Sequence, residues 1–380
     1  MPDGSTLNFI KFPGPNGQLL ELQVIGLLHS SICVRGRAGR IYLVLYEGRR
    51  CILKDAWVDI TRNFEGDILA QCGNAYGLPR FLAQSKFGYD TTYPDVVPSH
   101  RYQDRFSRET RERVRILMAT YGRPLSEYRS NPIKLLWAIY SAILGHWYLL
   151  KKGYLHRDVS NTNILVLDEP QPYDPIPEHI IPSALINPAS SCTGVLIDVD
   201  MALKVDNSGK RKLEDPPKEK RTGATAFMSI NMVFKIDAIP GPPQQTFYDD
   251  LESFFWVIVW VAFGIAIKSD RDIGKSEQRL WNASIEKAVR QNISNTTIDA
   301  LGGNVGKSAL TFSTFWETKV CFDPSSQPYV GVCRSLASLL FDSGRYTVPF
   351  RRSNQDLAYT RVLHAILEAI IELSKDQTTG

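Results

Sequence analysis

The chain has 380 residues, of which 43% are hydrophobic and 22% charged, as in ordinary soluble globular proteins, so we expect one large or two cooperating domains. The formal net charge of +4 is small for this length and gives no reason to expect a nucleic acid or an acidic membrane surface as a partner. The six cysteines are scattered without a C-x-x-C pair, which argues against a zinc site and is typical of reduced intracellular thiols.

The sequence shows neither a signal peptide nor a run long enough for a transmembrane helix. The N-terminal sequence MPDGSTLNFIKFPGPNG lacks the basic and then apolar layout of a signal peptide. The longest apolar run, residues 254–267, has 14 residues, which is short of the roughly 20 that a bilayer demands, so it predicts a helix buried on every side. We therefore expect a cytoplasmic or nuclear protein without a transmembrane segment.

The first third of the chain predicts a small antiparallel meander followed by a helix and a further strand. Short runs rich in Val, Ile, Leu and Tyr are separated by turns that contain glycine. These runs are residues 19–26 and 30–34, which count as the first strand, then 41–48 as the second and 51–58 as the third. A helical pattern over residues 61–77 and a strand pattern over residues 111–119 follow.

Helical patterns dominate after Pro124. Asn131 is the expected N-cap of a helix with proline in its first turn, and apolar residues recur at helical spacing until Gly153. Residues 163–167 and 194–198 predict a strand pair.

Two segments of the helical part have a loop composition. Residues 168–193 contain six prolines and predict a surface insertion. The charged run at residues 204–221 has no periodicity and predicts a solvated loop.

These patterns predict an α+β fold with a small β-rich N-terminal lobe and a larger helical C-terminal lobe. The predicted parts are an N-terminal extension (1–18), the N-terminal lobe (19–123), the C-terminal lobe (124–372) with its insertion (168–193), and a tail (373–380).

One set of residues supplies what phosphoryl transfer from a nucleotide needs, which is to hold the phosphates, neutralise charge and orient the attacking hydroxyl. Lys54, on the third strand of the meander, would contact the phosphates, and Glu65, eleven residues later, would pair with it. Gly36 and Gly39 lie in the turn between the first two strands, where backbone N–H groups would cover the phosphates.

The second part of the set begins in the stretch YLHRDVSNTNILVL at residues 154–167. Asp158, in a loop, would accept the proton of the hydroxyl, and Asn163, five residues on, would bind a metal ion. Asp198, at the end of the strand GVLID, would bind magnesium. Each residue alone has an ordinary structural explanation, such as a surface lysine or a capping aspartate, but their joint order favours catalysis.

With these stretches the chain resembles a eukaryotic-type protein kinase, and more closely the fungal-type protein kinase family, in LKDAW, HRDVSNTNIL, LIDVDMA, RTGATAFMS and YDDLESFFWV. The similarity covers about residues 20–372. It implies a two-lobed ATP-binding fold, Mg-ATP as phosphoryl donor and the hydroxyl of an unidentified protein as acceptor. It also implies that Met118 belongs to the nucleotide site and that Asp250 braces the backbone around His156 and Arg157.

Four departures from the general kinase pattern leave more than one function open. Ser160 stands where most Ser/Thr kinases have a lysine, and Asp200 stands where the glycine of DFG is expected. Ala224 falls at the place of a common threonine, and Asn231 replaces a glutamate that usually anchors the substrate loop. We expect an active Ser/Thr kinase. The alternatives are a pseudokinase that serves as an ATP-binding scaffold and a small-molecule phosphotransferase of the same fold.

Two further expectations concern regulation and a competing motif. Asp200 should lie near the magnesium site, and Thr222 would pair with Arg157 when phosphorylated, unless the basic residues around Thr222 merely keep the loop soluble. The stretch LGGNVGKSAL at residues 301–310 approaches a P-loop, but Leu301 stands where its first glycine is required, so a solvent loop is favoured.

Overall fold

The computed structural model describes part of the chain in detail. The described residues are 8–14, 18–31, 39–90, 111–175, 181, 185, 192–206, 227–230, 232, 245–262, 327–341 and 354–378. Several predictions fall outside these residues, namely Gly36, Thr222, Ala224, Asn231, residues 301–310, and most of the insertion and of the charged loop.

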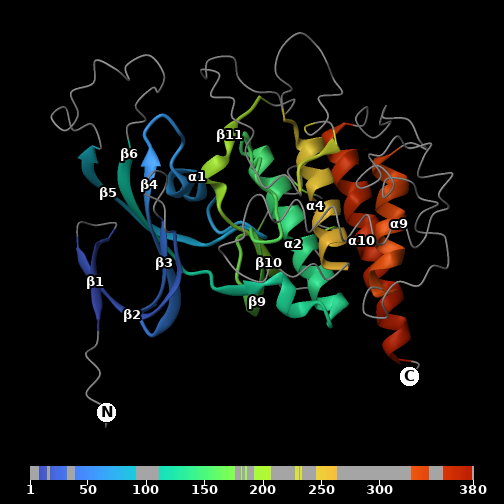
Figure 1. Ribbon diagram of the computed structural model, residues 1–380, viewed down its shortest axis with the longest axis horizontal. Helices are drawn as coiled ribbons and strands as arrows, with labels where there is room; N and C mark the ends of the chain where they lie inside the picture. The colour runs from blue at the N-terminus through green and yellow to red at the C-terminus, as the bar shows by residue number, and fades with distance from the viewer. Residues whose placement is uncertain are drawn as a thin grey trace, which may run out of the picture. The chain divides into compact units, whose positions relative to one another are not determined.

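The chain divides into two compact units. Unit 1 comprises Met1–Ala75 and Pro79–Tyr121, and unit 2 comprises Tyr76–Leu78 and Gly122–Gly380. Together they form a mixed architecture with a curled antiparallel sheet and several helices (Figure 1).

Unit 1 contains a six-stranded antiparallel sheet with the order β1-β2-β3-β4-β6-β5 (Figure 1). Its elements are β1 (Phe9–Pro13), β2 (Leu19–Ser30), β3 (Arg40–Tyr46), β4 (Arg49–Asp59), α1 (Glu65–Cys72), β5 (Phe81–Asp90) and β6 (Arg111–Met118). One hydrophobic core packs against the sheet and consists of Phe12, Leu22, Val44, Cys51, Leu53, Ala83 and Leu117.

The edges of this sheet differ from the prediction. Residues 9–13, which the sequence places in an N-terminal extension, form β1, because Phe12 is completely buried in the core. Lys54 therefore lies on the fourth strand in chain order, where the sequence predicted the third. The predicted helix over 61–77 is shorter, since α1 ends where Gly73 takes a positive φ of 64°.

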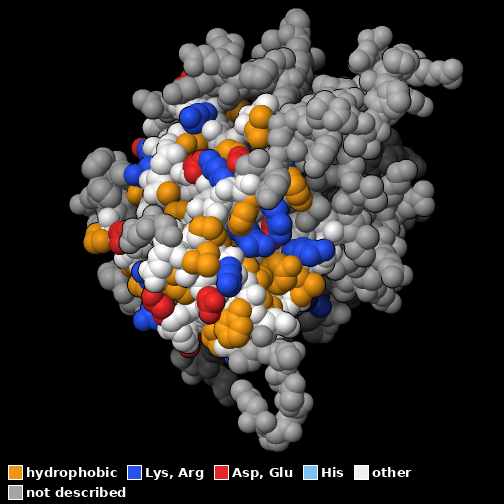
Figure 2. All heavy atoms as spheres, turned by 90° about the vertical axis from the view of Figure 1, so that its left-hand side faces the viewer, with side chains coloured by type: hydrophobic (Ala, Val, Ile, Leu, Met, Phe, Trp, Pro, Cys, Tyr) orange, Lys and Arg blue, Asp and Glu red, His pale blue; other side chains and the backbone are white. Residues whose placement is uncertain are grey.

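Strands β1 and β2 expose several apolar side chains. Phe9, Leu19, Ile25, Leu27 and Leu28 each have about half of their surface exposed. Figure 2 shows hydrophobic side chains interspersed with Lys and Arg on this side of the molecule, so no large field of one charge sign covers it.

Unit 2 combines long helices with two small antiparallel sheets, ordered β10-β9-β7 and β11-β8. Its elements are β7 (Gly122–Pro124), η1 (Leu125–Tyr128), α2 (Pro132–Lys151), β8 (Tyr154–Leu155), β9 (Ile164–Gln171), β10 (Cys192–Leu196), η3 (Val199–Met201), β11 (Leu203–Lys204), α4 (Phe247–Ala262), α9 (Gln327–Leu340) and α10 (Gln355–Thr378).

Helices α2 and α4 are the buried centre of unit 2. The predicted cap of α2 is confirmed, because the Asn131 side chain accepts a hydrogen bond from the Lys134 N–H at 3.1 Å and Pro132 is the first helical residue. The buried-helix prediction is confirmed over the described part of α4, where every residue from 249 to 262 is buried. Among the described residues, α2 is long and apolar enough to cross a bilayer, but it is mostly buried within the protein, as a core helix is.

Gly77 explains why residues 76–78 belong to unit 2. Its φ is +76°, and a Cβ at this position would overlap the carbonyl oxygen of Ser141 on α2, so only glycine fits. The Gly77 carbonyl accepts the Leu196 N–H at 2.9 Å, and its N–H donates to Cys192 Sγ at 3.3 Å. These contacts fix β10, the predicted strand that leads to Asp198, against α2.

Candidate active site

In unit 1 the Lys54 ammonium and the Glu65 carboxylate form an ion pair. Lys54 Nζ lies 2.6 Å from Glu65 Oε2, and the two side chains are 15% and 3% exposed. Lys54 is in the middle of β4, while Glu65 is the first residue of α1, where the positive end of the helix dipole favours a carboxylate. The pair expected from the eleven-residue spacing is thus formed, and it fixes the direction of the ammonium on the sheet.

The start of α1 is attached to β5 by Gln84. Its Oε1 accepts the N–H of Gly66 at 3.1 Å, and its Nε2 donates to Asp67 Oδ1 at 2.7 Å. Gln84 therefore satisfies one of the N–H groups that the first turn of a helix leaves unpaired. A Cβ on Gly66 would overlap the Gln84 amide, so a larger residue directly after Glu65 would displace Gln84 from these hydrogen bonds.

Gly39 and Met118 are the other predicted nucleotide residues of unit 1 that the structure describes. The Gly39 carbonyl accepts the N–H of Ser31 at 2.8 Å, which closes the base of the hairpin between β2 and β3. Met118 is the last residue of β6 and lies opposite Ile52 in the register with β4. Met118 is therefore beside the strand that carries Lys54, two positions along.

In unit 2, residues 156–163 form the candidate catalytic loop, and His156 fixes its first turn. His156 is fully buried; its Nδ1 accepts the N–H of Asp158 at 3.2 Å, so its Nε2 carries the proton and donates to the Ile197 carbonyl at 3.0 Å. Burial lowers the pKa of His156 to about 4, against the opposing charge of Asp250. The ring is therefore neutral at ordinary pH and links the loop to the end of β10.

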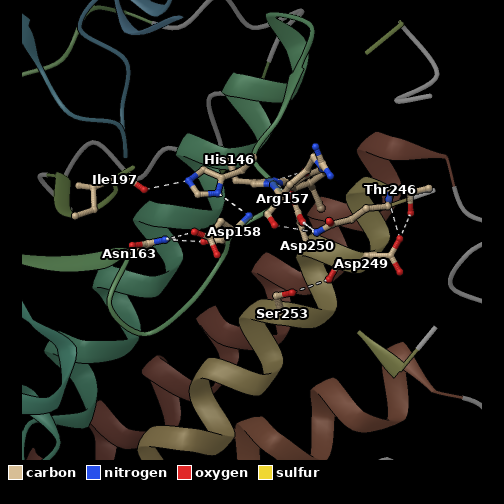
Figure 3. A network of polar contacts seen from close by, with 12 residues as sticks. His146, Arg157, Asp158, Asn163, Ile197, Thr246, Asp249, Asp250 and Ser253 are labelled. Atoms are coloured by element: carbon tan, nitrogen blue, oxygen red, sulfur yellow. Dashed lines mark hydrogen bonds and ion pairs between the residues drawn. The ribbon is translucent and has the colours of Figure 1, made fainter. Parts of the chain in front are cut away.

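Asp250, in the first turn of α4, holds the backbone of Arg157 (Figure 3). Its Oδ2 accepts the Arg157 N–H at 2.9 Å and lies 2.8 Å from His146 Nε2, while its Oδ1 accepts the Gln245 amide at 2.8 Å. Burial acts to raise the pKa of Asp250, but the hydrogen bonds from His146 and from the Arg157 N–H hold it below its usual range. Asp250 therefore stays an acceptor for all these donors.

Arg157 has a left-handed backbone with φ +70°, a conformation that costs a residue other than glycine about 1–3 kcal/mol. Such strain persists only where the surroundings enforce it. The surroundings do so here, because Asp250 accepts the N–H of Arg157 and the Gln245 amide donates to its carbonyl at 3.2 Å. Asp158 follows immediately, so this enforced turn sets the direction in which Asp158 enters the site.

Asp158 and Asn163 are in direct contact (Figure 3). Asn163 Nδ2 donates to the main-chain carbonyl of Asp158 at 2.8 Å and to its Oδ2 at 3.2 Å. Asp158 is half-buried and Asn163 is buried. Because the amide nitrogen faces Asp158, the amide oxygen of Asn163 lies on the other side of the group.

Asn163 and Asp198 lie at the same end of a strand pair. The strands β9 and β10 are antiparallel, so the start of β9, which follows Asn163, lies beside the end of β10, and the Ile197 N–H donates to the Asn163 carbonyl at 2.8 Å. Asp198 comes next, with φ 66° and ψ 56°. Among the described residues three that are not glycine have a positive φ, and two of them, Arg157 and Asp198, belong to this site.

Asp200 lies in the short helical turn η3 and is buried. The left-handed conformation in this segment falls on Asp198, and Asp200 keeps a negative φ, so an aspartate in the place of a glycine meets no backbone penalty here. The position of its carboxylate relative to a metal ion stays a prediction.

The residues at this end of the strand pair fit a magnesium ion that is shared with phosphates. Magnesium in such sites takes one or two protein oxygens and completes its shell with phosphate and water oxygens. The Asp198 carboxylate and the Asn163 amide oxygen are two hard ligands on adjacent chain ends. Among the described residues, no group of three or more His, Cys, Asp or Glu side chains could hold a metal ion without such help.

Two further carboxylates of α4 anchor the two residues that precede Asn231. Asp249 Oδ1 accepts the hydroxyl of Ser229 at 2.6 Å, and Glu252 Oε1 accepts the N–H of Ile230 at 2.6 Å. All of these side chains are buried. Asn231 itself is outside the described residues. The residues before it, Ser229 and Ile230, are nevertheless held by carboxylates of α4.

The structure brings the predicted residues together within each unit and adds others. Lys54 meets Glu65 in unit 1; in unit 2 Asp158, Asn163, Asp198, His156, Arg157 and Asp250 form one connected set. Sequence reasoning missed His146, Gln245, Asp249, Glu252 and Tyr359. Polar residues within the otherwise apolar patterns of α2 and α4 were the available signal.

Comparison with known proteins gives one family. A family model described as fungal protein kinase matches the sequence in two segments, residues 2–102 and 88–262. The matched segments contain every site residue predicted from the sequence, and they end before the C-terminal limit of the expected resemblance. No curated protein matches the sequence.

Proposed function

Because the chain belongs to the fungal protein kinase family, we propose that it is an active kinase that transfers the γ-phosphoryl group of Mg-ATP to a Ser or Thr hydroxyl of a protein. The observation that carries this proposal is the candidate catalytic loop. Asp158 contacts Asn163 and follows a strained residue that Asp250 holds in place. Strain of this kind collects at functional sites, where a fixed geometry is part of the mechanism.

The proposal extends to the fold. Unit 1, with its sheet and helix α1, corresponds to the small lobe of a two-lobed kinase, and unit 2 to the large lobe. What supports this assignment is that the candidate phosphate lysine lies in unit 1 and the candidate catalytic loop lies in unit 2.

In unit 1, Lys54 orients the phosphates of ATP and Glu65 keeps its ammonium in place. A chemical step that depends on positioning gains most from a cation whose direction is fixed before the substrate arrives. The turn that contains Gly36 and Gly39 covers the phosphates with backbone N–H groups. Met118, beside β4, contacts the nucleotide base.

In unit 2, Asp158 accepts the proton of the attacking hydroxyl at its carboxylate as the oxygen approaches phosphorus. Asn163 holds that carboxylate through its amide nitrogen. Asn163 and Asp198 would hold magnesium, with Asp200 close by, and the bound ion neutralises negative charge on the phosphates.

Ser160 favours a second candidate, a phosphotransferase with a small-molecule acceptor. Ser160 is buried, and its hydroxyl lies 3.0 Å from the hydroxyl of Thr162. A short side chain engaged in this way cannot extend a cation toward the transferred phosphate, as the lysine of most Ser/Thr kinases does. The alternative is then a small-molecule acceptor that does not depend on such a lysine to orient the transferred phosphate.

Labelled ATP tests the proposal. We expect the full chain to incorporate label into itself or into added protein acceptors, and Asp158→Asn to lose this transfer by a factor of about a thousand while ATP binding, measured by calorimetry, is retained. Asp168→Asn is a matched control, because Asp168 is a half-exposed aspartate of the same unit that contacts Arg123 and Tyr128.

Three outcomes separate the functions. Label on protein that disappears in Asp158→Asn supports the kinase. Turnover only with small acceptors supports the second candidate, and ATP binding without any turnover supports a pseudokinase scaffold.

A further inference from the structure

His146 and Tyr359 extend the hydrogen bonds behind Asp250 to the last helix of the chain. His146 Nε2 lies 2.8 Å from Asp250 Oδ2, and His146 Nδ1 lies 2.6 Å from the Tyr359 hydroxyl. The three residues come from α2, α4 and α10, and each is fully buried. A continuous chain of polar contacts thus runs from the C-terminal helix to the candidate catalytic loop, whose end is drawn in Figure 3.

The chemistry of the carboxylate sets the direction of the first hydrogen bond. A carboxylate only accepts, so His146 donates from Nε2 to Asp250. The second hydrogen bond joins His146 Nδ1 to the Tyr359 hydroxyl, which keeps its proton because burial raises the pKa of Tyr359 well above its usual value. Asp250 Oδ2 also accepts the N–H of Arg157, which is the strained residue before Asp158.

Packing holds the Tyr359 ring without help from its hydroxyl. The ring stacks on Trp147 with the centroids 5.0 Å apart and the planes 7° apart. It also stacks on Phe247 at 6.1 Å and 19°. Stacked aromatic rings of this kind stabilise the contact between helices beyond their buried area. The hydroxyl is therefore a separate feature. Its hydrogen-bond partner is His146, which in turn contacts Asp250.

We infer that His146 and Tyr359 are positioning residues for phosphoryl transfer, and that they act through Asp250 on the backbone of Arg157 and so on Asp158. The inference rests on the proposed function for its effect on turnover. Neither residue touches the reacting atoms; both keep the Asp250 carboxylate in the orientation that the Arg157 N–H requires. Hydrogen bonds in such a buried chain polarise and support one another, so a change at Tyr359 reaches the loop.

The first test removes only the Tyr359 hydroxyl. In the full chain, Tyr359→Phe keeps the stacked ring, and we expect kcat to fall about tenfold with the KM for ATP unchanged, the factor that corresponds to losing one buried hydrogen bond at the transition state. Tyr329→Phe is the matched control, because Tyr329 is equally buried and donates at 2.7 Å to the carbonyl of Arg129, outside the candidate catalytic loop. We expect kcat of the control to equal that of the parent.

The second test asks for rescue at His146. Glutamine places its amide nitrogen near the position of imidazole Nε2, so His146→Gln keeps a donor for Asp250, while His146→Leu removes it. We expect His146→Gln to retain kcat within about threefold and His146→Leu to lose more than about tenfold. Equal losses in the two variants would overturn the positioning role of His146, because volume alone would then explain both.

A readout independent of turnover separates this inference from the proposed function. Amide hydrogen exchange of a peptide that spans Arg157 and Asp158 should be faster in Tyr359→Phe and in His146→Leu than in Tyr329→Phe. Unchanged exchange overturns the inference even if the protein is an active kinase. If the parent protein transfers no phosphate, the proposed function fails, and the exchange of the Arg157 amide alone decides whether Tyr359 acts on the loop.

Discussion

The two units position their candidate residues by different means. In unit 1, Lys54 is held by its side chain, through one ion pair with Glu65 at 2.6 Å. In unit 2, Asp158 has a side-chain contact with Asn163, but its backbone is held as well, because His156 and Asp250 accept the N–H groups of Asp158 and Arg157. An ion pair fixes the end of a long side chain, whereas contacts to the backbone fix the direction in which a short side chain leaves the chain.

Two buried aspartates show the same contrast in their partners. Asp55, next to Lys54 but on the opposite face of β4, accepts both guanidinium groups of Arg113 and Arg115 at 2.7 and 2.9 Å. Burial acts to raise the pKa of Asp55, but Arg113 and Arg115 lower it below its usual value. Asp55 thus ties β4 to β6 with charges. Asp250 accepts from His146, from the Gln245 amide and from the N–H of Arg157, so it is the aspartate that can transmit geometry to the candidate catalytic loop.

The largest expected effect breaks the side-chain contact of unit 1. Lys54→Met should lower turnover about a hundredfold, because the phosphates lose the cation that orients them. Lys86→Met is the control, since Lys86 forms an exposed ion pair with Asp67 at 3.3 Å, and we expect its turnover within about twofold of the parent. Steady-state kinetics with labelled ATP measures both. Turnover of Lys54→Met within about threefold of the parent would show that Lys54 is not the phosphate lysine.

The next largest effect separates Asp250 from Asp55. In Asp250→Asn one of the three donors, from His146, Gln245 and the Arg157 backbone, must face an NH₂ group, so we expect kcat to fall about thirtyfold. Asp55→Asn should leave kcat unchanged. Both variants should lose about 2–4 kcal/mol of the free energy of unfolding, because each weakens the hydrogen bonds of a buried carboxylate.

Urea unfolding and kinetics on the two aspartate variants decide the contrast. Equal stability with unequal kcat supports a specific role of Asp250 in the catalytic loop. A proportional loss of kcat in Asp55→Asn would mean that stability alone governs turnover and that the comparison of the two aspartates is wrong.

The elements that could be predicted are those whose start and end are marked by capping or helix-breaking residues. Helix α2 could be placed because Asn131 and Pro132 start it and Gly153 follows its end. Strand β1 could not, since FIKFP is short, ends in proline and buries only Phe12, and it forms a strand because β2 offers it a partner. Strand β5 likewise carries Gln84, Ser85 and Lys86 in its middle, and pairing with β6 outweighs that polar composition.

The candidate site was predictable where the chemistry lies close in sequence. Asp158 and Asn163 are five residues apart, and their contact follows from one loop. The residues that support them come from distant positions: His146 and Asp250 are 104 residues apart, and His146 and Tyr359 are 213 residues apart. Local patterns mark such residues only as polar interruptions of apolar helices, so their partners depend on how the helices pack.

The smallest expected effect is a pH dependence of the free energy of unfolding that is due to His156 in unit 2. The pKa of buried His156 is lowered from 6.5 to about 4, so between these values the unfolded chain binds a proton that the folded chain does not. The free energy of unfolding should therefore fall as the pH is lowered through this range, by about 1.4 kcal/mol per pH unit at most. The lowered pKa of Asp250 acts in the same sense but only below the ordinary 3.8 of an aspartate, so it does not enter here.

His156→Gln should remove this slope, because the glutamine amide can still donate to the Ile197 carbonyl but does not titrate. At neutral pH we expect it to lose about 1 kcal/mol or less, the net worth of a hydrogen bond with weaker geometry. His364→Gln is the control, since His364 is exposed on α10 and its removal should leave the slope as it is. Urea unfolding at pH values from about 7 to about 4.5 measures all three proteins. If the free energy of unfolding of His156→Gln keeps the same slope against pH, the proton belongs to another group and the prediction for His156 is wrong.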